Sequence, residues 1–276
     1  MTEQLQYEPE LIFYAGSALL EGPEWDESNQ QLYFISISDG IIYRFNPETT
    51  ELTTYLTDGP VGAAVLDNEG KLLSAEKSGI YRIDPETGER TFICQPNKDD
   101  RLRYNDGKLD PKGRFFIGTM GDEEVIEGAA ALYIVEGSEY KEVLDGLTIA
   151  NGLGWSEDGA TFYHVESGEK IVRSFAFDMD TGELSGEKVL FEVTDGGTPD
   201  GMCVDLDGHL WVAEYGGGKA CKWHSTTGEK LMEVQMPVSN VTSCCLGGKE
   251  RDHLYLTTAK EEGEPLSGGL FKVRIR

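Results

Sequence analysis

The stretch LDPKGRFFIG, Leu109–Gly118, decides the fold because the chain repeats its pattern. An apolar residue comes first, a polar turn that usually contains glycine follows, and a short apolar run closes the phrase. Six copies occur, each beginning at an apolar anchor residue: Trp25, Leu66, Leu109, Trp155, Val204 and Leu246. Successive anchors are 41 to 49 residues apart. Apolar runs that alternate with turns at such a period are typical of repeated β-sheet units.

A second phrase lies between the copies of the first. It consists of two runs rich in β-branched and aromatic residues on either side of a tight turn, and it occurs at residues 42–56, 80–94, 131–144, 172–191 and 221–234. The copy IYRIDPETGERTFIC shows the pattern, because the turn-forming DPETG separates two strand-like runs. Each unit of about 40–50 residues therefore holds two hairpins, which is the content of one propeller blade.

The two ends of the sequence predict how the ring closes. LFKVRI at 270–275 matches the third strand of the other units but lacks the strand that should follow it, and PELIFYAG at 9–16 resembles that missing strand. Pairing the two would cover exposed strand edges. We therefore predict an all-β, six-bladed β-propeller with four antiparallel strands per blade, formed by residues 1–276 as a single domain. A β-sandwich is the alternative, but sandwiches rarely carry six matching units.

Composition narrows the classes of function. The chain has 276 residues, 34 of them glycine, and a formal net charge of −26. This charge argues against a nucleic-acid-binding protein or one that docks on anionic membranes, both of which need basic surfaces. No apolar run is long enough for a membrane span, and MTEQLQYEPE at the N-terminus lacks the features of a signal peptide. The five cysteines follow no metal-binding spacing, so we expect a reduced, cytoplasmic protein.

One phase of the repeat carries residues that suit a metal ion. The position four residues before each anchor is occupied by Glu21, Gly62, Asn105, Asn151, Asp200 and Thr242. We expect these six residues to form a ring at one end of the central channel, each just before a strand. Four of them carry a carboxylate or carboxamide oxygen, and a fifth carries a hydroxyl. Converging oxygen ligands favour a hard divalent cation such as Ca²⁺, Mg²⁺ or Mn²⁺. The alternative is that the Asn and Asp residues only form turns.

Several long motifs resemble those of a known family. They are EGPEW (21–25), RYNDGKLDPKGRFFIGTM (103–120), NGLGWSEDG (151–159), PDGMCVDLDGHLWVAEY (199–215) and TSCCLGGK (242–249). On these motifs the chain resembles the senescence marker protein/gluconolactonase/luciferin-regenerating enzyme (regucalcin-like) family over nearly its whole length. The resemblance implies a six-bladed propeller with one divalent metal in its channel. Many members of the family hydrolyse sugar lactones.

The resemblance also assigns residues. It implies that Glu21, Asn151 and Asp200 bind the metal and that Arg103 and Asn105 line the substrate site. Ca²⁺ is the expected cofactor, with Mg²⁺, Mn²⁺ and Zn²⁺ left open. The chain departs from the family pattern at two positions, Ser36 and Glu166. Neither of them is an expected metal ligand. They are expected to alter hydrogen bonds around the site.

The expected reaction is the opening of a sugar lactone by water. A divalent cation acts as a Lewis acid on the carbonyl oxygen and lowers the pKa of a bound water, so both the electrophile and the nucleophile are activated. Asp200 is the first candidate for the general base, although a metal-bound carboxylate is a weak base. Asp106 and Glu123 are the alternatives, and Glu123 is also assigned to the substrate site. We expect a small-molecule substrate and a monomer.

Other chemistries have weaker support. Hydrolysis of phosphotriesters or fluorophosphates would use similar metal chemistry, and a calcium-binding regulatory protein without turnover would need only the metal ligands. The four histidines show no HExxH spacing, and neither a GxSxG motif nor a P-loop is present. The cysteines in GMCVD and TSCC, Cys203, Cys244 and Cys245, are expected to be buried structural residues.

Overall fold

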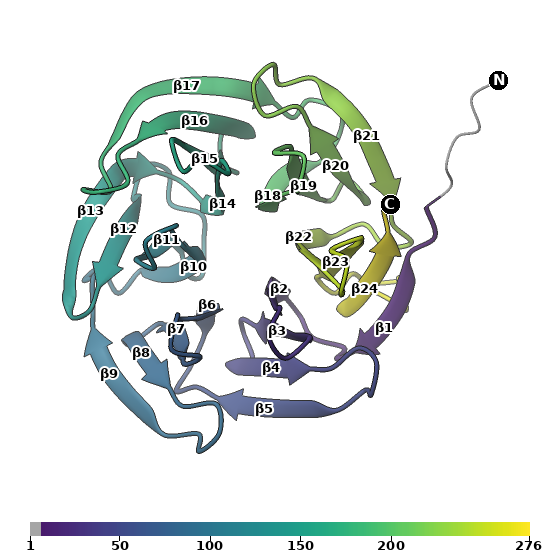
Figure 1. The fold of residues 1–276 in the computed structure, drawn as a ribbon, viewed down its shortest axis with the longest axis horizontal. Helices are drawn as coiled ribbons and strands as arrows, with labels where there is room; N and C mark the ends of the chain where they lie inside the picture. The colour runs from purple at the N-terminus through teal and green to yellow at the C-terminus, as the bar shows by residue number, and fades with distance from the viewer. Residues whose placement is uncertain (1–6) are drawn as a thin grey trace.

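The chain folds into a ring of six β-sheets around a central axis (Figure 1). The computed structural model describes residues 7–276. Within them, 24 strands form six four-stranded antiparallel sheets, and no helix occurs. The prediction of a six-bladed β-propeller with four strands per blade is therefore confirmed. No helix in this part of the chain is long and apolar enough to cross a membrane.

In the first five blades the strands follow one another outward from the axis in chain order. The first blade contains β2 (Leu20–Asp26), β3 (Gln31–Ser36), β4 (Ile41–Phe45) and β5 (Leu52–Leu56). The second contains β6 (Val61–Leu66), β7 (Leu72–Glu76), β8 (Gly79–Ile83) and β9 (Arg90–Cys94). The third contains β10 (Leu102–Leu109), β11 (Phe115–Gly121), β12 (Ala130–Glu136) and β13 (Glu139–Leu147).

The remaining blades complete the circle. The fourth contains β14 (Ala150–Trp155), β15 (Thr161–Glu166), β16 (Ile171–Phe177) and β17 (Leu184–Glu192). The fifth contains β18 (Thr198–Val204), β19 (Leu210–Tyr215), β20 (Lys219–Trp223) and β21 (Lys230–Gln235). The sixth contains β22 (Val241–Gly247), β23 (His253–Thr258), β24 (Gly269–Arg274) and, outermost, β1 (Glu10–Tyr14).

The ring closes as the sequence predicts. Strand β1 pairs antiparallel with β24, and Leu11 lies opposite Phe271. The aromatic ring of Phe13 lies 5.5 to 5.6 Å from the rings of three residues in the first blade: Phe34, Tyr43 and Phe45. The closing strand therefore belongs to the sixth blade by its hydrogen bonds and to the first blade by its packing.

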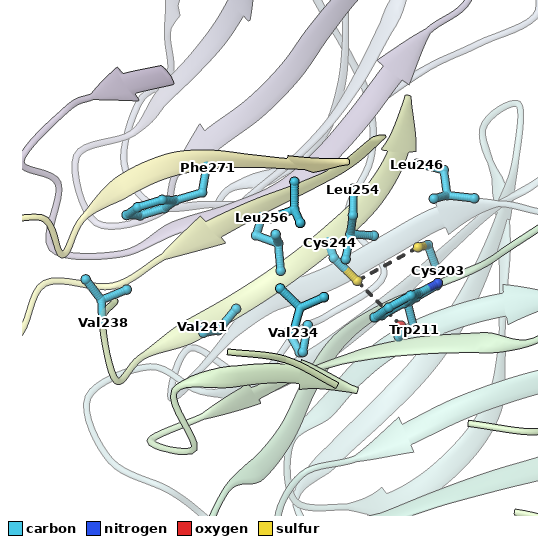
Figure 2. Close-up of a cluster of buried hydrophobic side chains, with 13 residues drawn as sticks. Cys203, Trp211, Val234, Val238, Val241, Cys244, Leu246, Leu254, Leu256 and Phe271 are labelled. Atoms are coloured by element: carbon cyan, nitrogen blue, oxygen red, sulfur yellow. Dashed lines mark hydrogen bonds between the residues drawn. The ribbon is translucent and has the colours of Figure 1, made fainter. Parts of the chain in front are cut away.

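Apolar side chains between neighbouring blades make the core. Figure 2 shows one such cluster between the fifth and sixth blades, which includes Trp211 beside Cys203 and Cys244. Trp25 stacks on Tyr255 of the sixth blade at a centroid distance of 5.4 Å. Trp223 stacks on Phe191 of the fourth blade at 4.1 Å. These tryptophans therefore pack neighbouring blades together through aromatic contacts.

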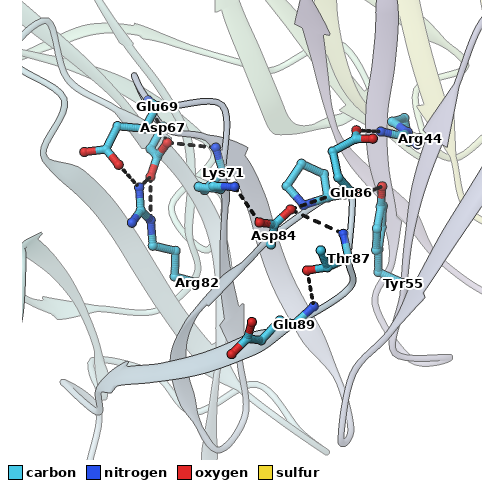
Figure 3. Close-up of polar contacts among 11 residues, drawn as sticks. Arg44, Tyr55, Asp67, Glu69, Lys71, Arg82, Asp84, Glu86, Thr87 and Glu89 are labelled. Carbon is cyan, nitrogen blue, oxygen red and sulfur yellow. Dashed lines mark hydrogen bonds and ion pairs between the residues drawn. The ribbon is translucent and has the colours of Figure 1, made fainter.

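The polar turns of the repeat are held by their aspartates. In the second blade, Asp67 Oδ1 accepts hydrogen bonds from the backbone N–H groups of Glu69 and Lys71, both at 2.9 Å (Figure 3). Lys71 Nζ in turn lies 2.6 Å from Asp84 Oδ2, which ties two turns of this blade together. An aspartate that bonds to the N–H groups that follow it stabilises a tight turn. This explains why Asp recurs in the turns of the repeat.

Candidate metal centre at one end of the channel

The innermost strand of every blade is irregular near its beginning. The register between the first and second strands shifts in all six blades, for example between Glu21 and Glu24 in β2 and between Pro199 and Met202 in β18. Such bulges bend a strand and redirect its side chains, and they are frequent next to active sites. The irregularities coincide with the ring of polar residues that the repeat singles out.

The ring residues lie within the innermost strands rather than just before them. Glu21, Asn151 and Asp200 are the second or third residues of β2, β14 and β18, and Asn105 is the fourth residue of β10. The expectation that they precede the strands is therefore corrected, because the bulges let strand pairing begin earlier. These four side chains are nearly buried. The alternative in which the Asn and Asp residues only form turns does not hold, since they belong to strands.

The two acidic members of the ring are in an unfavourable environment as ions. Burial raises the pKa of the Glu21 carboxyl well above its usual value, and the nearby carboxylates of Asp200 and Asp106 raise it further. Burial also raises the pKa of Asp200 well above its usual value, with Asp106 adding to the shift. Buried like charges repel each other in a region of low dielectric. A bound cation would offset both penalties.

Asn151 provides an independent test of whether a cation fits. Its Nδ2 group donates hydrogen bonds to Asp200 Oδ1 and, over 3.1 Å, to Ser167 Oγ. Its Oδ1 atom is buried and has no hydrogen-bond partner among the described residues. A buried carbonyl oxygen without a partner is costly. Together with the two carboxylates, this oxygen makes a donor set that fits a hard divalent ion.

The amide oxygen of Asn151 is needed for this set of metal ligands. Within residues 7–276, no group of three or more histidine, cysteine, aspartate or glutamate side chains has the arrangement of a metal site. The third carboxylate of the region, Asp106, is buried and accepts a 2.7 Å hydrogen bond from the backbone N–H of Gly107. Any cation here must therefore combine carboxylate and amide oxygens, as Glu21, Asn151 and Asp200 can.

Arg103 and Asn105 form a buried pair beside the acidic groups. Arg103 Nη1 donates to Asn105 Oδ1 at 2.9 Å, and Asn105 Nδ2 donates to the carbonyl oxygen of Ala150 at 3.0 Å. Arg103 is only 9% exposed, and burial lowers the pKa of its guanidinium. Its Nη2 contacts the sulfur of Met120 at 3.0 Å, which is a weak acceptor. This nitrogen can exchange the sulfur for a stronger oxygen acceptor.

The candidate Glu123 is in a different environment from Asp106. Glu123 is exposed and follows β11, and it lies near the ion pair between Lys77 and Asp122, where its charge helps to raise the pKa of the lysine. Asp122 also acts on Arg103 by its charge. Glu123 is thus exposed, unlike the buried residues of the ring. Its assignment to the substrate site stays a prediction.

Sequence reasoning missed the residues that orient the ring. Ser167 Oγ accepts from Asn151 and donates to the carbonyl oxygen of Pro199 at 2.6 Å. Thr242 does not present its hydroxyl to the channel as a free donor, because its Oγ1 donates to the carbonyl oxygen of Leu20 at 2.6 Å. It fixes the backbone that carries Glu21. No repeat phase could reveal Ser167, because it follows a second strand rather than an innermost one.

The two departures from the family pattern have separate structural roles. Glu166 is fully buried and accepts hydrogen bonds from the backbone N–H groups of Ile149 and Gly168 at 2.9 and 3.0 Å, so it holds the start of β14 in place. Ser36 is buried and bonds to Asp39 and Ser17, both at 2.5 Å. Glu166 therefore acts close to Asn151, whereas Ser36 joins segments at the start of the first blade.

The chain is similar to known proteins over most of its length. A family model described as SMP-30/Gluconolactonase/LRE-like region matches residues 19–260. Regucalcin from Oryctolagus cuniculus is 34% identical over 270 residues, which covers 92% of this chain and 89% of that protein.

Two solved structures have the same fold. A luciferin-regenerating enzyme superimposes with a TM-score of 0.88 at 26% identity, covering 97% of this chain and 95% of the other. A regucalcin from Agrobacterium tumefaciens, described as a calcium-binding protein, superimposes with a TM-score of 0.91 at 24% identity, covering 98% and 96%. The second likeness concerns the fold alone.

Proposed function

Because the chain belongs to the SMP-30/gluconolactonase/LRE-like family, we propose that it is a divalent-metal-dependent hydrolase that opens a sugar lactone. The observation that carries the proposal is the buried, unpartnered Oδ1 atom of Asn151 beside the carboxylates of Glu21 and Asp200. We further propose that the protein is cytoplasmic and monomeric.

Glu21, Asn151 and Asp200 would hold the cation. Their oxygen atoms suit Ca²⁺ best, since it accepts flexible sets of carboxylate and amide ligands, and Mg²⁺, Mn²⁺ and Zn²⁺ remain candidates. When bound, the cation would supply Lewis-acid polarisation of the lactone carbonyl. It would also neutralise the repulsion among the buried carboxylates.

The side chains around the metal ligands have distinct tasks in this proposal. Arg103 donates from Nη2 to an oxygen of the substrate in place of the Met120 sulfur. Asn105 holds the guanidinium in position through its Oδ1 atom. A carboxylate removes the proton from the attacking water, with Asp200 as the first candidate. Asp106 is the alternative, because it is buried beside Asp200 and acts on it by its charge.

The test is a lactonase assay on metal-stripped, full-length protein. Gluconolactone is supplied with a pH indicator, and Ca²⁺, Mg²⁺, Mn²⁺ and Zn²⁺ are added in turn. We expect turnover to return with one of the metals. The Asp200→Ala variant should lose both metal binding and turnover, the latter by about 100-fold or more. Turnover no faster than spontaneous hydrolysis with every metal would refute the lactonase.

A second pair of variants separates the enzyme from a calcium-binding protein without turnover, which is the competing function. Arg103→Ala should abolish turnover while calorimetry still detects metal binding. Arg101→Ala is the matched control, because Arg101 is exposed and pairs with Asp99 outside the site. If the protein binds Ca²⁺ but neither the wild type nor the control hydrolyses any lactone, the calcium-binding function replaces the enzyme.

A further inference from the structure

Two thiols face each other between the fifth and sixth blades. Cys203 on β18 and Cys244 on β22 have their sulfur atoms 3.8 Å apart, and both side chains are buried (Figure 2). Cys244 Sγ also lies 3.4 Å from the carbonyl oxygen of Trp211. The pair lies on the innermost strands and takes no part in the candidate metal centre. All five cysteines of the chain are free thiols.

The inner strands of the fifth and sixth blades pack closely beside this pair. A Cβ atom added to Gly201, two residues before Cys203, would lie 2.8 Å from the Cα atom of Ser243, the neighbour of Cys244. That Cβ atom would lie even closer to the Ser243 side chain, at 2.0 Å from Oγ and 2.4 Å from Cβ, so the two inner strands pack closely here with the serine side chain against the glycine. Disulfide formation requires the two sulfur atoms to approach from 3.8 Å to about 2.05 Å. That movement is small compared with the rotation available to a cysteine side chain.

Both thiols are buried, but only one of them borders a pocket. Cys203 lines a pocket of about 390 Å³ at the end of the channel opposite to the metal centre, together with Lys108 and Arg251. Cys244 is only 1% exposed and does not line this pocket. The contact with the Cys244 sulfur lowers the pKa of Cys203, and the charges of Lys108 and Arg251 add to this effect, whereas burial and the charge of Asp205 oppose it. A lowered pKa favours the thiolate, which is the form of cysteine that reacts with oxidants, and the pocket gives a small oxidant a way to reach Cys203.

We propose that Cys203 and Cys244 are an oxidative modification site at which a hydroperoxide converts the two thiols into a disulfide between the fifth and sixth blades. The Cys203 thiolate attacks one peroxide oxygen, the O–O bond breaks, and Cys203 becomes a sulfenic acid while hydroxide leaves. Cys244 sulfur then attacks the Cys203 sulfur and displaces the hydroxyl group as water. In sum, two thiols and one hydrogen peroxide give one disulfide and two waters.

Cys245 is an internal control for this site. It lines the same pocket as Cys203, so it meets the same reagents. Burial raises the pKa of its thiol well above the usual value, and it packs in a different apolar cluster, with Leu20 and Tyr255. Neighbouring residues of a strand point to opposite faces, which separates Cys245 from the Cys203–Cys244 pair. Access alone should therefore not oxidise it.

The experiment treats reduced, full-length protein with increasing hydrogen peroxide and then alkylates the remaining thiols in denaturant. We expect the product to be about 2 Da lighter than the reduced chain before alkylation. Two of the five cysteines should escape alkylation. Peptide mapping should find Cys203 linked to Cys244, and a reductant should reverse the change. Cys245→Ser should form the same disulfide at the wild-type rate.

The single variants distinguish the roles of the two thiols. Cys244→Ser should stop at the sulfenic acid on Cys203, which dimedone traps, whereas Cys203→Ser should give neither product. Circular dichroism checks that each variant folds, and Cys244→Ala replaces the serine variant if it does not. The proposal fails if Cys203 oxidises only to sulfinic acid, if the disulfide involves Cys245 or Cys94, or if no thiol pair is lost. None of these readouts depends on lactonase activity, so they test this site separately from the proposed function.

Discussion

At the residue scale, the candidate metal centre depends on how one amide is oriented. Asn151 can present Oδ1 to a cation only if its Nδ2 group is held elsewhere, and Ser167 Oγ and Asp200 Oδ1 accept its two hydrogen bonds. Ser167 is itself anchored to the carbonyl oxygen of Pro199 on the next blade. A hydroxyl that never touches the metal therefore decides which end of the amide faces the channel.

Replacement of this serine should weaken metal binding. In Ser167→Ala the Nδ2 group loses one acceptor, so the amide can rotate, and we expect the affinity for Ca²⁺ to fall about 10- to 100-fold. Calorimetric titration of metal-stripped protein measures the change. Ser78→Ala is a suitable control because that hydroxyl bonds to Tyr81 on the exposed surface of the second blade. Equal affinities in Ser167→Ala and the wild type would contradict the role of Ser167.

At this scale the repeat predicts the candidate metal ligands but not the residues that orient them by hydrogen bonds. Glu21, Asn151 and Asp200 share one phase, so sequence alone groups them. Ser167 lies outside that phase, and its contact with Asn151 arises from the turn after β15. The sequence also cannot tell that Thr242, which shares the phase, turns its hydroxyl to a backbone carbonyl. Hydrogen-bond partners of this kind depend on three-dimensional distances.

At the element scale, the innermost strands combine close packing with irregular pairing. A Cβ atom on Gly62 in β6 would lie 2.3 Å from the backbone carbonyl of Tyr104 in β10. This contact lies directly before Asn105. Glycine is required here because the backbone of the next blade occupies the space of a side chain. The ring position of Gly62 therefore serves the packing of its neighbour rather than metal binding.

An alanine at this position should destabilise the protein and disturb the site. We expect Gly62→Ala to lower the free energy of unfolding by about 3 kcal/mol, because two backbones must move apart. Urea unfolding followed by fluorescence measures this change. Thr53→Ala, on the exposed outer strand of the first blade, should change it by less than about 0.5 kcal/mol. A Gly62→Ala protein as stable as the wild type would show that the strands adapt without cost.

Strand number and order were predictable at this scale because turn residues separate every apolar run. The bulges were not, since a bulge adds a residue to one strand without a distinctive residue type. This is why the ring residues were expected before the strands and are found inside them.

At the scale of the whole molecule, the ring is held closed by a strand from the beginning of the chain. Strand β1 completes the sixth blade, and Phe13 packs against rings of the first blade. The closure was predictable because the last repeat lacks one strand and the first residues supply its pattern. The contact of Phe13 with the neighbouring blade was not, since it follows from the curvature of the ring.

Loss of this aromatic contact should weaken the closure. Phe13→Ala removes a half-buried ring from a cluster that joins two blades, and we expect about 2–3 kcal/mol less stability toward urea. Tyr14→Ala is the matched control because the side chain of Tyr14 is 51% exposed. If both variants lose the same stability, the first blade does not help to hold the closing strand.

The position of β1 also constrains the order of folding during synthesis. Its partner β24 comes after the strands of the other five blades in the chain, so β1 emerges with no strand to pair with. The first five blades can assemble as their residues appear, since each is built from consecutive strands. The sixth must wait, and during that interval β1 is an unpaired edge that can associate with other chains. A chain in which synthesis stops before β24 would therefore leave β1 and the outer edge of β23 unpaired and prone to aggregation.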